Sequence, residues 1–217
     1  MLKGCGLVSV RLLTWSGINL GDPRRVIVIA VKTSAGGVKD KGVDYYINNY
    51  PEDRISRWLI EAVKFPSVLE HVAFTFLIEG ISRVTSHQLV RHRLASYTQE
   101  SQRYSAAEKG YVLPESVRKL GFEERFKEVV DAAYRVYDEM INAGIPYEDA
   151  RYILPQAVAT RVLMTVNLRE LIHIACLRLS PLAQWEIREV VNEMVKETSR
   201  VIPELPKVIE EGCKRGI

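Results

Sequence analysis

The residues best suited to chemistry lie in one segment, residues 81–105, which combines arginine with small polar side chains. Its only acidic residue is Glu100, and it has no lysine. Its arginines are Arg83, Arg91, Arg93 and Arg103. A planar guanidinium group can hold a phosphate or a carboxylate through two parallel hydrogen bonds, and neighbouring hydroxyl and amide groups can complete the shell around the anion. The segment therefore predicts a shaped anion-binding site rather than diffuse attraction of negative charge.

The spacing of these side chains predicts how they face if residues 81–93 form a helix. Gln88 and Arg91 then lie on one face, whereas Arg91 and Arg93 diverge by about 200° at ~100° per residue. The two arginines would therefore serve two ligands or two subunits. Residues 101–104 follow on an expected loop, where a phosphate can meet both side chains and backbone N–H groups.

Two other interpretations of this segment remain open. The first is a solvent-exposed basic helix followed by a polar loop. The second is a DNA-recognition helix, which needs a helix-turn-helix partner and usually a wider basic face. Neither the partner nor the wider face is visible in the sequence.

A second arginine series lies downstream, in a stretch from Lys127 to Lys196 with no lysine between its ends. Its members include Arg151, Arg161, Arg169, Arg178 and Arg188. We expect Arg161 and Arg178 to be partly buried, and a buried guanidinium needs an acceptor. For Arg161 and Arg188 an internal salt bridge is the favoured interpretation. The candidate partners are Glu70, Glu79, Glu170 and Glu186.

The composition indicates a globular protein of one domain. The chain has 217 residues, of which 47% are apolar and 26% charged, which argues against disorder and fibrous repeats. Thirty basic and 27 acidic residues leave a net charge of +3, too small to indicate a nucleic-acid-binding protein. No run of about 18 consecutive apolar residues occurs, so we expect no transmembrane helix and no membrane partner.

The three cysteines, Cys5, Cys176 and Cys213, are an odd number without C-x-x-C spacing. This pattern argues against a disulfide framework or a zinc ribbon and favours a reducing cytosol. The amino terminus lacks the long apolar segment and cleavage site of a secretory signal peptide. We therefore expect a soluble, cytoplasmic protein.

No metal site and no common catalytic motif is visible. His87 and His92 are five residues apart, and no carboxylate joins either one at the spacing of metal ligands. Neither a G-x-S-x-G nucleophile motif nor a glycine-rich phosphate loop occurs in the sequence. We therefore expect no bound metal.

The elements that must position these residues follow from hydrophobic periodicity and from helix-start and turn signals. We expect strands over residues 7–14, 72–78 and 158–166, the second of them bounded by Gly80. We expect helices over residues 23–31 (with Asp22 as N-cap), 52–64, 81–93, 126–141, between Pro146 and Pro155, and over 168–177 and 182–199. Residues 36–42 are expected as a loop and residues 200–217 as a short exposed tail. The mixture predicts an α/β protein of the α+β type, in which helices flank one modest mixed sheet within a single domain of residues 1–217.

Several blocks of residues resemble one enzyme family. Arg91-His92-Arg93, seven further residues and Ser101 reproduce the R-H-R-x7-S signature of flavin-dependent thymidylate synthases, and the likeness continues through Gln102-Arg103-Tyr104-Ser105. The further blocks are Ser67-Val68-Leu69-Glu70-His71, Ala150-Arg151 with Leu154-Pro155, Asn167-Leu168-Arg169 with Leu177-Arg178, and Ala183-Gln184-Trp185-Glu186. The resemblance covers roughly residues 60–190 and is weak over residues 1–50.

The resemblance implies a fold like that of the thymidylate synthase complementing proteins and a reductive methylation of dUMP to dTMP. The carbon would come from 5,10-methylenetetrahydrofolate and the hydride from reduced FAD. NADPH would reduce the flavin again, and tetrahydrofolate would be released. The family forms homotetramers in which FAD and dUMP are held where subunits meet, with no nucleic acid or membrane as partner.

The resemblance also implies roles for single residues. The positions that match flavin contacts are Ser67, Arg91, His92, Arg93, Gln99, Asn167, Arg169 and His173. The positions that match the dUMP site are Gln88, Arg91, Ser101, Gln102, Arg103, Arg151 and Arg178. Arg178 is the expected catalytic residue, because a guanidinium beside uracil N3 stabilises the negative charge that develops on the ring.

Two positions depart from the family pattern. Phe65 stands where many members have histidine, and Gln99 stands where some have glutamate. The cysteines have no activating neighbours in the sequence, which agrees with a route that needs no thiolate. Ser101 has no evident general base beside it, so we assign it binding and orientation rather than nucleophilic attack.

Two alternatives to the synthase remain open. One is a nucleotide- or nucleic-acid-binding module that uses the arginine-rich helix without catalysis. The other is a degenerate family member that binds FAD and dUMP but does not turn over.

Overall fold

The computed structural model of the chain describes residues 3–4, 8–107 and 109–217. The described chain divides into two compact units. Unit 1 comprises the residues up to Ser9 together with residues 78–91 and 98–162. Unit 2 comprises residues 10–77, 92–97 and 163–217. The single domain of residues 1–217 stays a prediction.

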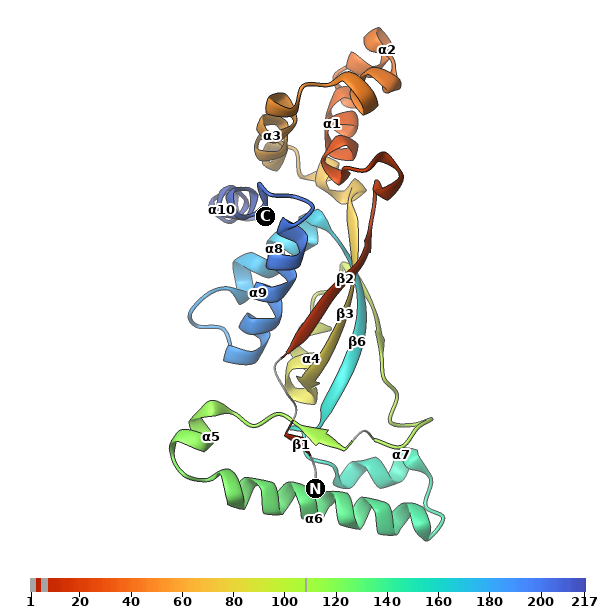
Figure 1. Cartoon of the computed structure of the whole chain (residues 1–217), viewed down its shortest axis with the longest axis vertical. Helices are drawn as coiled ribbons and strands as arrows, with labels where there is room; N and C mark the ends of the chain where they lie inside the picture. Colours follow the sequence, from red (N-terminus) through yellow and green to blue (C-terminus); the bar gives the residue numbers. More distant parts are fainter. Residues whose placement is uncertain (1–2, 5–7, 108) are drawn as a thin grey trace. The chain divides into compact units, whose positions relative to one another are not determined.

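Four strands form the main sheet, in the order β2-β3-β6-β4 (Figure 1). They are β2 (Ser9–Trp15), β3 (Ala73–Ser82), β4 (Ala95–Gln99) and β6 (Ala159–Asn167). Thr75 of β3 lies beside Thr165 of β6, with 2.9 Å between the hydroxyl oxygens. Further along β3, Glu79 lies beside Arg161, which comes earlier in β6, so the two strands run antiparallel. The expected α+β fold with one modest sheet is confirmed.

A second sheet has two short parallel strands, β1 (Lys3–Gly4) and β5 (Gly110–Tyr111). The sequence predicts neither of them.

The salt bridge predicted for Arg161 is confirmed, because its Nε lies 3.6 Å from Glu79 and 3.7 Å from Glu100. The Arg161 side chain is 45% exposed, however, so the expectation that it is partly buried is wrong.

The predicted strands agree with β2 and β6 to within a few residues, although Leu7 lies outside the described residues. The boundary predicted at Gly80 is wrong, because β3 continues to Ser82. Gly80 has φ 75°, a conformation that glycine adopts without steric cost, so the strand passes through it instead of ending there. The sequence does not predict β4, because its five residues do not show a clear alternation of apolar and polar side chains. In the structure these residues alternate between half-buried and exposed positions.

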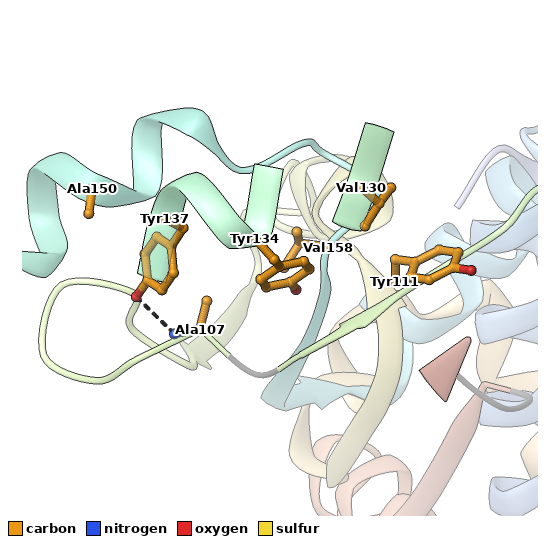
Figure 2. Close-up of a cluster of buried hydrophobic side chains, with 7 residues drawn as sticks. All are labelled: Ala107, Tyr111, Val130, Tyr134, Tyr137, Ala150 and Val158. Carbon is orange, nitrogen blue, oxygen red and sulfur yellow. Dashed lines mark hydrogen bonds between the residues drawn. The ribbon is translucent and has the colours of Figure 1, made fainter. Parts of the chain in front are cut away.

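The core of unit 1 forms around a long helix, α6 (Glu123–Asn142), as the periodicity predicts. Its buried side chains pack against residues before and after the helix (Figure 2). The Tyr137 hydroxyl accepts a hydrogen bond from the Ala107 N–H at 3.1 Å, and the Tyr134 hydroxyl donates to the Gly110 carbonyl at 3.0 Å. The helix therefore anchors the chain just beyond the arginine-rich segment.

The remaining helical turns of unit 1 are short. They are α4 (Arg83–Leu89), α5 (Glu115–Lys119), α7 (Tyr147–Ala150) and a 3-10 turn over Arg151–Ile153. Gly144, with φ 87°, follows the end of α6, and Pro146 precedes α7, both as expected. This arrangement places Arg151 at the start of a tight turn.

Unit 2 contains six α-helices among its described residues. They are α1 (Pro23–Ser34), α2 (Gly37–Lys41), α3 (Glu52–Glu61), α8 (Leu168–Arg178), α9 (Trp185–Ser199) and α10 (Leu205–Arg215). The start of α1 is as predicted, because the Asp22 carboxylate accepts a hydrogen bond from the Arg24 N–H at 2.9 Å and Pro23 occupies the first helical position. The α8 helix packs against both α9 and α10.

Two predictions of secondary structure in unit 2 are wrong. Residues 37–41, expected in a loop, form α2. The expected exposed tail contains α10, whose buried residues Leu205, Val208 and Ile209 follow the spacing of a helix face. Pro206 lies in the first turn of α10, where a missing N–H costs no hydrogen bond, so it begins the helix instead of breaking it.

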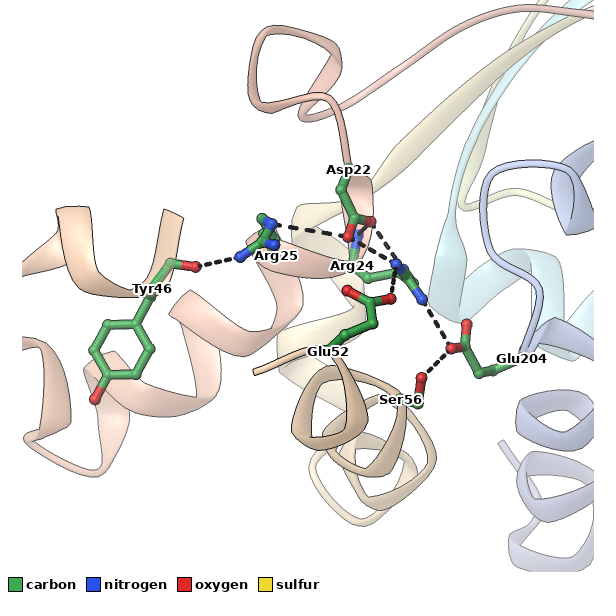
Figure 3. Close-up of polar contacts among 7 residues, drawn as sticks. All are labelled: Asp22, Arg24, Arg25, Tyr46, Glu52, Ser56 and Glu204. Atoms are coloured by element: carbon green, nitrogen blue, oxygen red, sulfur yellow. Dashed lines mark hydrogen bonds and ion pairs between the residues drawn. The ribbon is translucent and has the colours of Figure 1, made fainter. Parts of the chain in front are cut away.

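An ion-pair network in unit 2 joins segments that are far apart in the sequence (Figure 3). The Arg24 guanidinium contacts Asp22 at 3.0 Å and Glu204 at 2.9 Å, and it also pairs with Glu52. The Ser56 hydroxyl donates to Glu204. Because the Arg24 side chain is only 14% exposed, these carboxylates supply the acceptors that a buried guanidinium needs.

A disulfide bond between Cys176 and Cys213 joins α8 to α10, with 5.4 Å between the Cα atoms. The expectation of no disulfide is therefore wrong. The two residues are 37 apart in the sequence, so their pairing follows from the packing of α8 against α10 and not from a spacing motif.

Among the described residues, none of the helices is both long enough and apolar enough to span a membrane.

Candidate functional site

The arginine-rich segment begins with a helix that is shorter than predicted. The α4 helix starts after Ser82, whose hydroxyl accepts a hydrogen bond from the Thr85 N–H at 3.1 Å, and it ends at Leu89. Arg91 and Arg93 lie beyond it in exposed positions, so the helical angle predicted between them does not apply.

The loop predicted after β4 is confirmed, and local hydrogen bonds shape it. The Ser101 hydroxyl accepts a hydrogen bond from the Arg103 N–H at 3.2 Å, and the Ser105 hydroxyl donates to the Ser101 carbonyl at 3.0 Å. Ser101 is half-buried, whereas Arg103 and Tyr104 are exposed. This turn holds the backbone N–H of Arg103 on the Ser101 hydroxyl, while the Arg103 guanidinium pairs with Glu148.

Three arginines and a glutamine of unit 1 gather in what we call the arginine cluster: Arg83, Gln102, Arg103 and Arg151. Arg83 donates to the Gln102 carbonyl oxygen at 3.1 Å. Both Arg103 and Arg151 contact Glu148, the first through its carboxylate and the second through its backbone carbonyl at 3.0 Å. Burial, and then the positive charge of Arg151, lower the pKa of Arg83. Like charges held this close favour an anion between them.

The sequence does not single out Arg83 as a site residue, because Arg83 belongs to no motif. Its only sequence signal is its place in the arginine-rich segment. The half-buried side chain and its contact with Gln102 identify it in the structure. Gln88, expected to contact the nucleotide, is half-buried on α4 of the same unit.

The Gln99 side chain joins three elements of unit 1. Its amide nitrogen donates to the Ser86 hydroxyl at 2.9 Å and lies 3.3 Å from the Thr160 hydroxyl, so it ties β4 to α4 and β6. The structure thus gives the side chain an internal role at the position where a flavin contact is predicted.

Four of the predicted flavin contacts lie on α8, at its N-cap, or on the 3-10 turn of Pro66–His71, which packs against α8. Asn167 caps α8, its side-chain oxygen accepting from the Glu170 N–H at 2.9 Å. Arg169 pairs with Glu70 at 2.5 Å, and His173 lies one turn further along with its Nδ1 3.3 Å from the Ile217 carbonyl. Ser67 is exposed on the 3-10 turn.

A buried histidine contacts the predicted catalytic arginine. His92 is 5% exposed, and its Nε2 accepts a hydrogen bond from Arg178 Nε at 3.0 Å. The His173 ring lies close by, with 6.3 Å between the ring centroids. Burial, the charge of Arg178 and His173 together lower the pKa of His92 to about 4, so the ring is neutral near pH 7. The structure thus places the His92 ring against Arg178 and away from solvent.

The two predicted residue sets follow the two units. The expected dUMP contacts lie in unit 1, except for Arg178, and the expected flavin contacts lie in unit 2, except for Arg91 and Gln99. The part of the chain that the structure describes holds no group of three His, Cys, Asp or Glu side chains arranged for a metal ion. Unit 1 therefore holds side chains suited to binding an anion. Unit 2 holds a neutral imidazole beside a guanidinium.

Comparison with known proteins agrees with this chemistry. The family described as thymidylate synthase complementing protein matches residues 18–204. The flavin-dependent thymidylate synthase of Sulfolobus acidocaldarius is 42% identical over 212 residues, covering 95% of this chain and 78% of the relative. That of Saccharolobus solfataricus is 42% identical over 216 residues with the same coverage. The crystal structure of the UMP/dUMP methylase PolB from Streptomyces cacaoi, bound with 5-Br dUMP, has the same fold, with a TM-score of 0.80 at 20% identity over 94% of this chain and 95% of that one.

Proposed function

This chain belongs to the flavin-dependent thymidylate synthase family of enzymes, and from that premise we propose that it methylates dUMP to dTMP. The observation that carries the proposal beyond family membership is the hydrogen bond from Arg178 Nε to the buried ring of His92. A guanidinium held in this way presents a fixed positive charge to a substrate whose ring becomes negatively charged during the reaction. The proposal needs no nucleophilic side chain.

The arginine cluster is suited to the nucleotide phosphate. Arg83, Arg103 and Arg151 supply guanidinium groups, and Ser101 supplies a hydroxyl beside Arg103. A dianionic phosphate accepts several charge-assisted hydrogen bonds at once, each stronger than a neutral one. Gln88 is proposed to bind the pyrimidine, and Arg178 to stabilise the charge at uracil N3.

The residues of unit 2 fit a flavin dinucleotide. Arg169 and Asn167 lie at the amino-terminal end of α8, where a guanidinium and the positive end of the helix dipole suit a pyrophosphate. Ser67 and His173 add a hydroxyl and an imidazole. When bound, reduced FAD would supply the hydride, and we propose NADPH as its reductant and 5,10-methylenetetrahydrofolate as the carbon donor. Phe65 is 54% exposed, so its ring is available to cover a flat ring of the flavin or folate.

We further propose a homotetramer that acts in the cytoplasm. Tyr104 is 77% exposed and Tyr152 is 84% exposed, each directly after an arginine of the cluster. Large exposed aromatic side chains are enriched at contacts between proteins. A subunit packed on these tyrosines would complete the nucleotide site.

The test is an assay of dTMP formation with FAD, NADPH, 5,10-methylenetetrahydrofolate and dUMP. We expect turnover by the parent and a loss of roughly 100-fold or more in Arg178→Ala, as for the removal of other groups that stabilise a transition-state charge. Arg200→Ala is the matched control, because the Arg200 side chain is 67% exposed and pairs with Glu197 within the same helical turn. We expect the control to retain the parent rate.

The colour of the protein separates the synthase from its rivals. The purified synthase should be yellow, and the flavin absorbance should bleach anaerobically when NADPH is added. A colourless protein that takes up no FAD and binds DNA with a steep salt dependence would instead be a nucleic-acid-binding module. A yellow protein that binds dUMP without forming dTMP would be a degenerate family member.

A further inference from the structure

A buried chain of polar groups in unit 2 reaches from Glu170 through His92 to Arg178. Arg178 Nε donates to His92 Nε2 at 3.0 Å, and on the far side of the ring His92 Nδ1 lies 3.8 Å from Glu170 Oε1. His92 and Glu170 are each 5% exposed. The Tyr97 hydroxyl donates to the His92 backbone carbonyl at 2.9 Å, which holds the histidine backbone in place. Glu170 belongs to no predicted set of site residues.

The hydrogen bond from Arg178 shows which nitrogen of His92 carries the proton. A guanidinium has only donors, so His92 Nε2 must accept and the proton of the neutral ring must be on Nδ1. That N–H faces the Glu170 carboxylate. The separation of 3.8 Å is too long for a direct hydrogen bond, and the carboxylate acts through its charge instead.

A carboxylate at this position is costly to bury. Its neighbours on α8, Leu171, Ile172 and Ile174, are fully buried apolar residues, so an apolar side chain would fit the same core. Burial raises the pKa of Glu170, while the charges of His173 and Arg169 act in the opposite direction. A buried charge that stability alone does not favour needs another explanation.

We propose that Glu170 is a positioning residue that holds His92 as the Nδ1–H tautomer, so that Arg178 donates through Nε and keeps both terminal NH₂ groups for the substrate. This rests on the proposed function of Arg178 at the dUMP ring. The arrangement resembles the carboxylate–histidine pairs that orient metal ligands, with a guanidinium in place of the metal. If His92 were protonated, two donors would face each other and Arg178 would turn away.

The test compares Glu170→Gln with the parent in the full chain loaded with FAD. Glu170→Gln keeps the size of the side chain and removes its charge. We expect kcat/KM for dUMP to fall about tenfold, the lower end of the effect of removing such an orienting group. Glu170→Asp keeps the charge on a shorter side chain and should lie between the parent and Glu170→Gln. Glu186→Gln is the matched control, because Glu186 is also a buried glutamate of unit 2, at 2% exposure.

A second readout does not depend on turnover. With ¹⁵N-labelled histidine, the nitrogen shifts of His92, assigned by their loss in His92→Gln, should show protonated Nδ1 in the parent. The fraction protonated at Nε2 should rise in Glu170→Gln and stay at the parent value in Glu186→Gln. A loss of stability common to both glutamine variants would lower their thermal unfolding temperatures. It would not change the fraction of His92 protonated at Nε2.

The outcomes separate the two proposals. If the parent turns over and Glu170→Gln matches it in both rate and tautomer, the positioning role is wrong. If the parent forms no dTMP, the proposed function fails, and the tautomer shift still decides whether Glu170 orients His92. If Glu170→Gln does not fold, Glu170→Asp decides in its place: parent values of rate and tautomer would overturn the role, and reduced rate with a shifted tautomer would support it.

Discussion

His92 is the residue whose charge state the fold controls most strongly. Its ring is buried between Arg178, His173 and Glu170, with Tyr97 on its backbone. Because burial and the nearby positive charge lower its pKa to about 4, the folded protein keeps this ring neutral at a pH where an unfolded chain has begun to protonate it. Its neutrality is therefore linked to stability as well as to the hydrogen bond with Arg178.

This linkage predicts a loss of stability in acid. Between the unfolded pKa of roughly 6.5 and the folded value of about 4, the unfolded chain binds more protons, so stability is full above that range and falls as the pH is lowered through it. The free energy of unfolding should drop by about 3 kcal/mol from this group alone between about pH 7 and pH 4. Urea unfolding at several pH values measures it. In His92→Gln, which keeps an acceptor but does not titrate, this part of the drop should vanish, and an unchanged pH dependence would contradict the assignment.

Arg83 gives a prediction for the nucleotide phosphate. Arg83→Gln should weaken dUMP binding by about 10-fold to 100-fold, because a hydrogen bond to a charged group contributes about 1.5–3 kcal/mol. Arg83→Lys should recover little of the loss, since an ammonium lacks the planar pair of donors. Calorimetric titration with dUMP and with deoxyuridine tests the role: only the phosphate-bearing ligand should lose affinity. Arg118→Gln, an exposed arginine on α5, serves as the control and should bind dUMP normally.

At the scale of elements, the sequence predicts those whose signals are local. The N-cap at Asp22 and the apolar stripe of α6 are enough to place two helices. The sequence overextends α4, because the apolar period continues past Leu89 although the chain turns there into β4. It misses α10, because a proline such as Pro206 is usually taken to end a helix. In the structure Pro206 lies in the first turn of α10, where proline is favoured.

The site follows the same rule. Motif residues such as Arg103 and Arg151 are found from the sequence, and the structure brings them together around Glu148. Arg83 and Glu170 carry no motif, and only tertiary packing places Arg83 beside Gln102 and Glu170 beside His92. Contacts between residues so far apart in the chain leave no periodic trace that a single sequence could show.

The disulfide gives a prediction at this scale. The bond between Cys176 and Cys213 closes a loop with a sequence separation of 37, so in the chain-entropy model its removal should cost about 4 kcal/mol of stability. Cys213→Ser should lower the urea midpoint accordingly, and the double variant Cys176→Ser/Cys213→Ser should lower it equally. Reductant should lower the midpoint of the parent and leave both variants unaffected. A midpoint that is the same in parent and variants would mean that the bond contributes nothing.

Over the whole molecule, the small net charge has a definite location. Residues 81–105 contain four arginines and one glutamate, which accounts for the full +3, and the other residues hold 26 basic and 26 acidic groups. The structure distributes this excess over both units, with Arg83, Arg91 and Arg103 in unit 1 and Arg93 in unit 2. A near-neutral protein therefore carries its whole positive excess on the residues proposed to bind nucleotide and flavin.

The proposed tetramer gives a prediction for the whole molecule. Four chains of 24.7 kDa should give a particle of about 99 kDa in light scattering. Tyr152→Asp should shift the mass toward smaller species and lower the activity, because a carboxylate buried at a subunit contact costs several kcal/mol. Lys119→Asp, which places the same carboxylate on an exposed position of α5, should leave the mass unchanged. A parent that scatters as a monomer would contradict the tetramer.

The bond from α8 to α10 also makes a covalent ring of the chain between them, and α9 lies within it. Leu182, in the turn before α9, is 97% exposed and accessible to a protease. A cut there would open one peptide bond without releasing a fragment, so the nicked protein would run as one band on a denaturing gel and as two bands after reduction. A cut at Leu120, which is 75% exposed but outside the ring, would separate the pieces without reductant. The ring therefore keeps Arg178 covalently joined to the carboxyl-terminal helix even in a chain that has been cleaved between them.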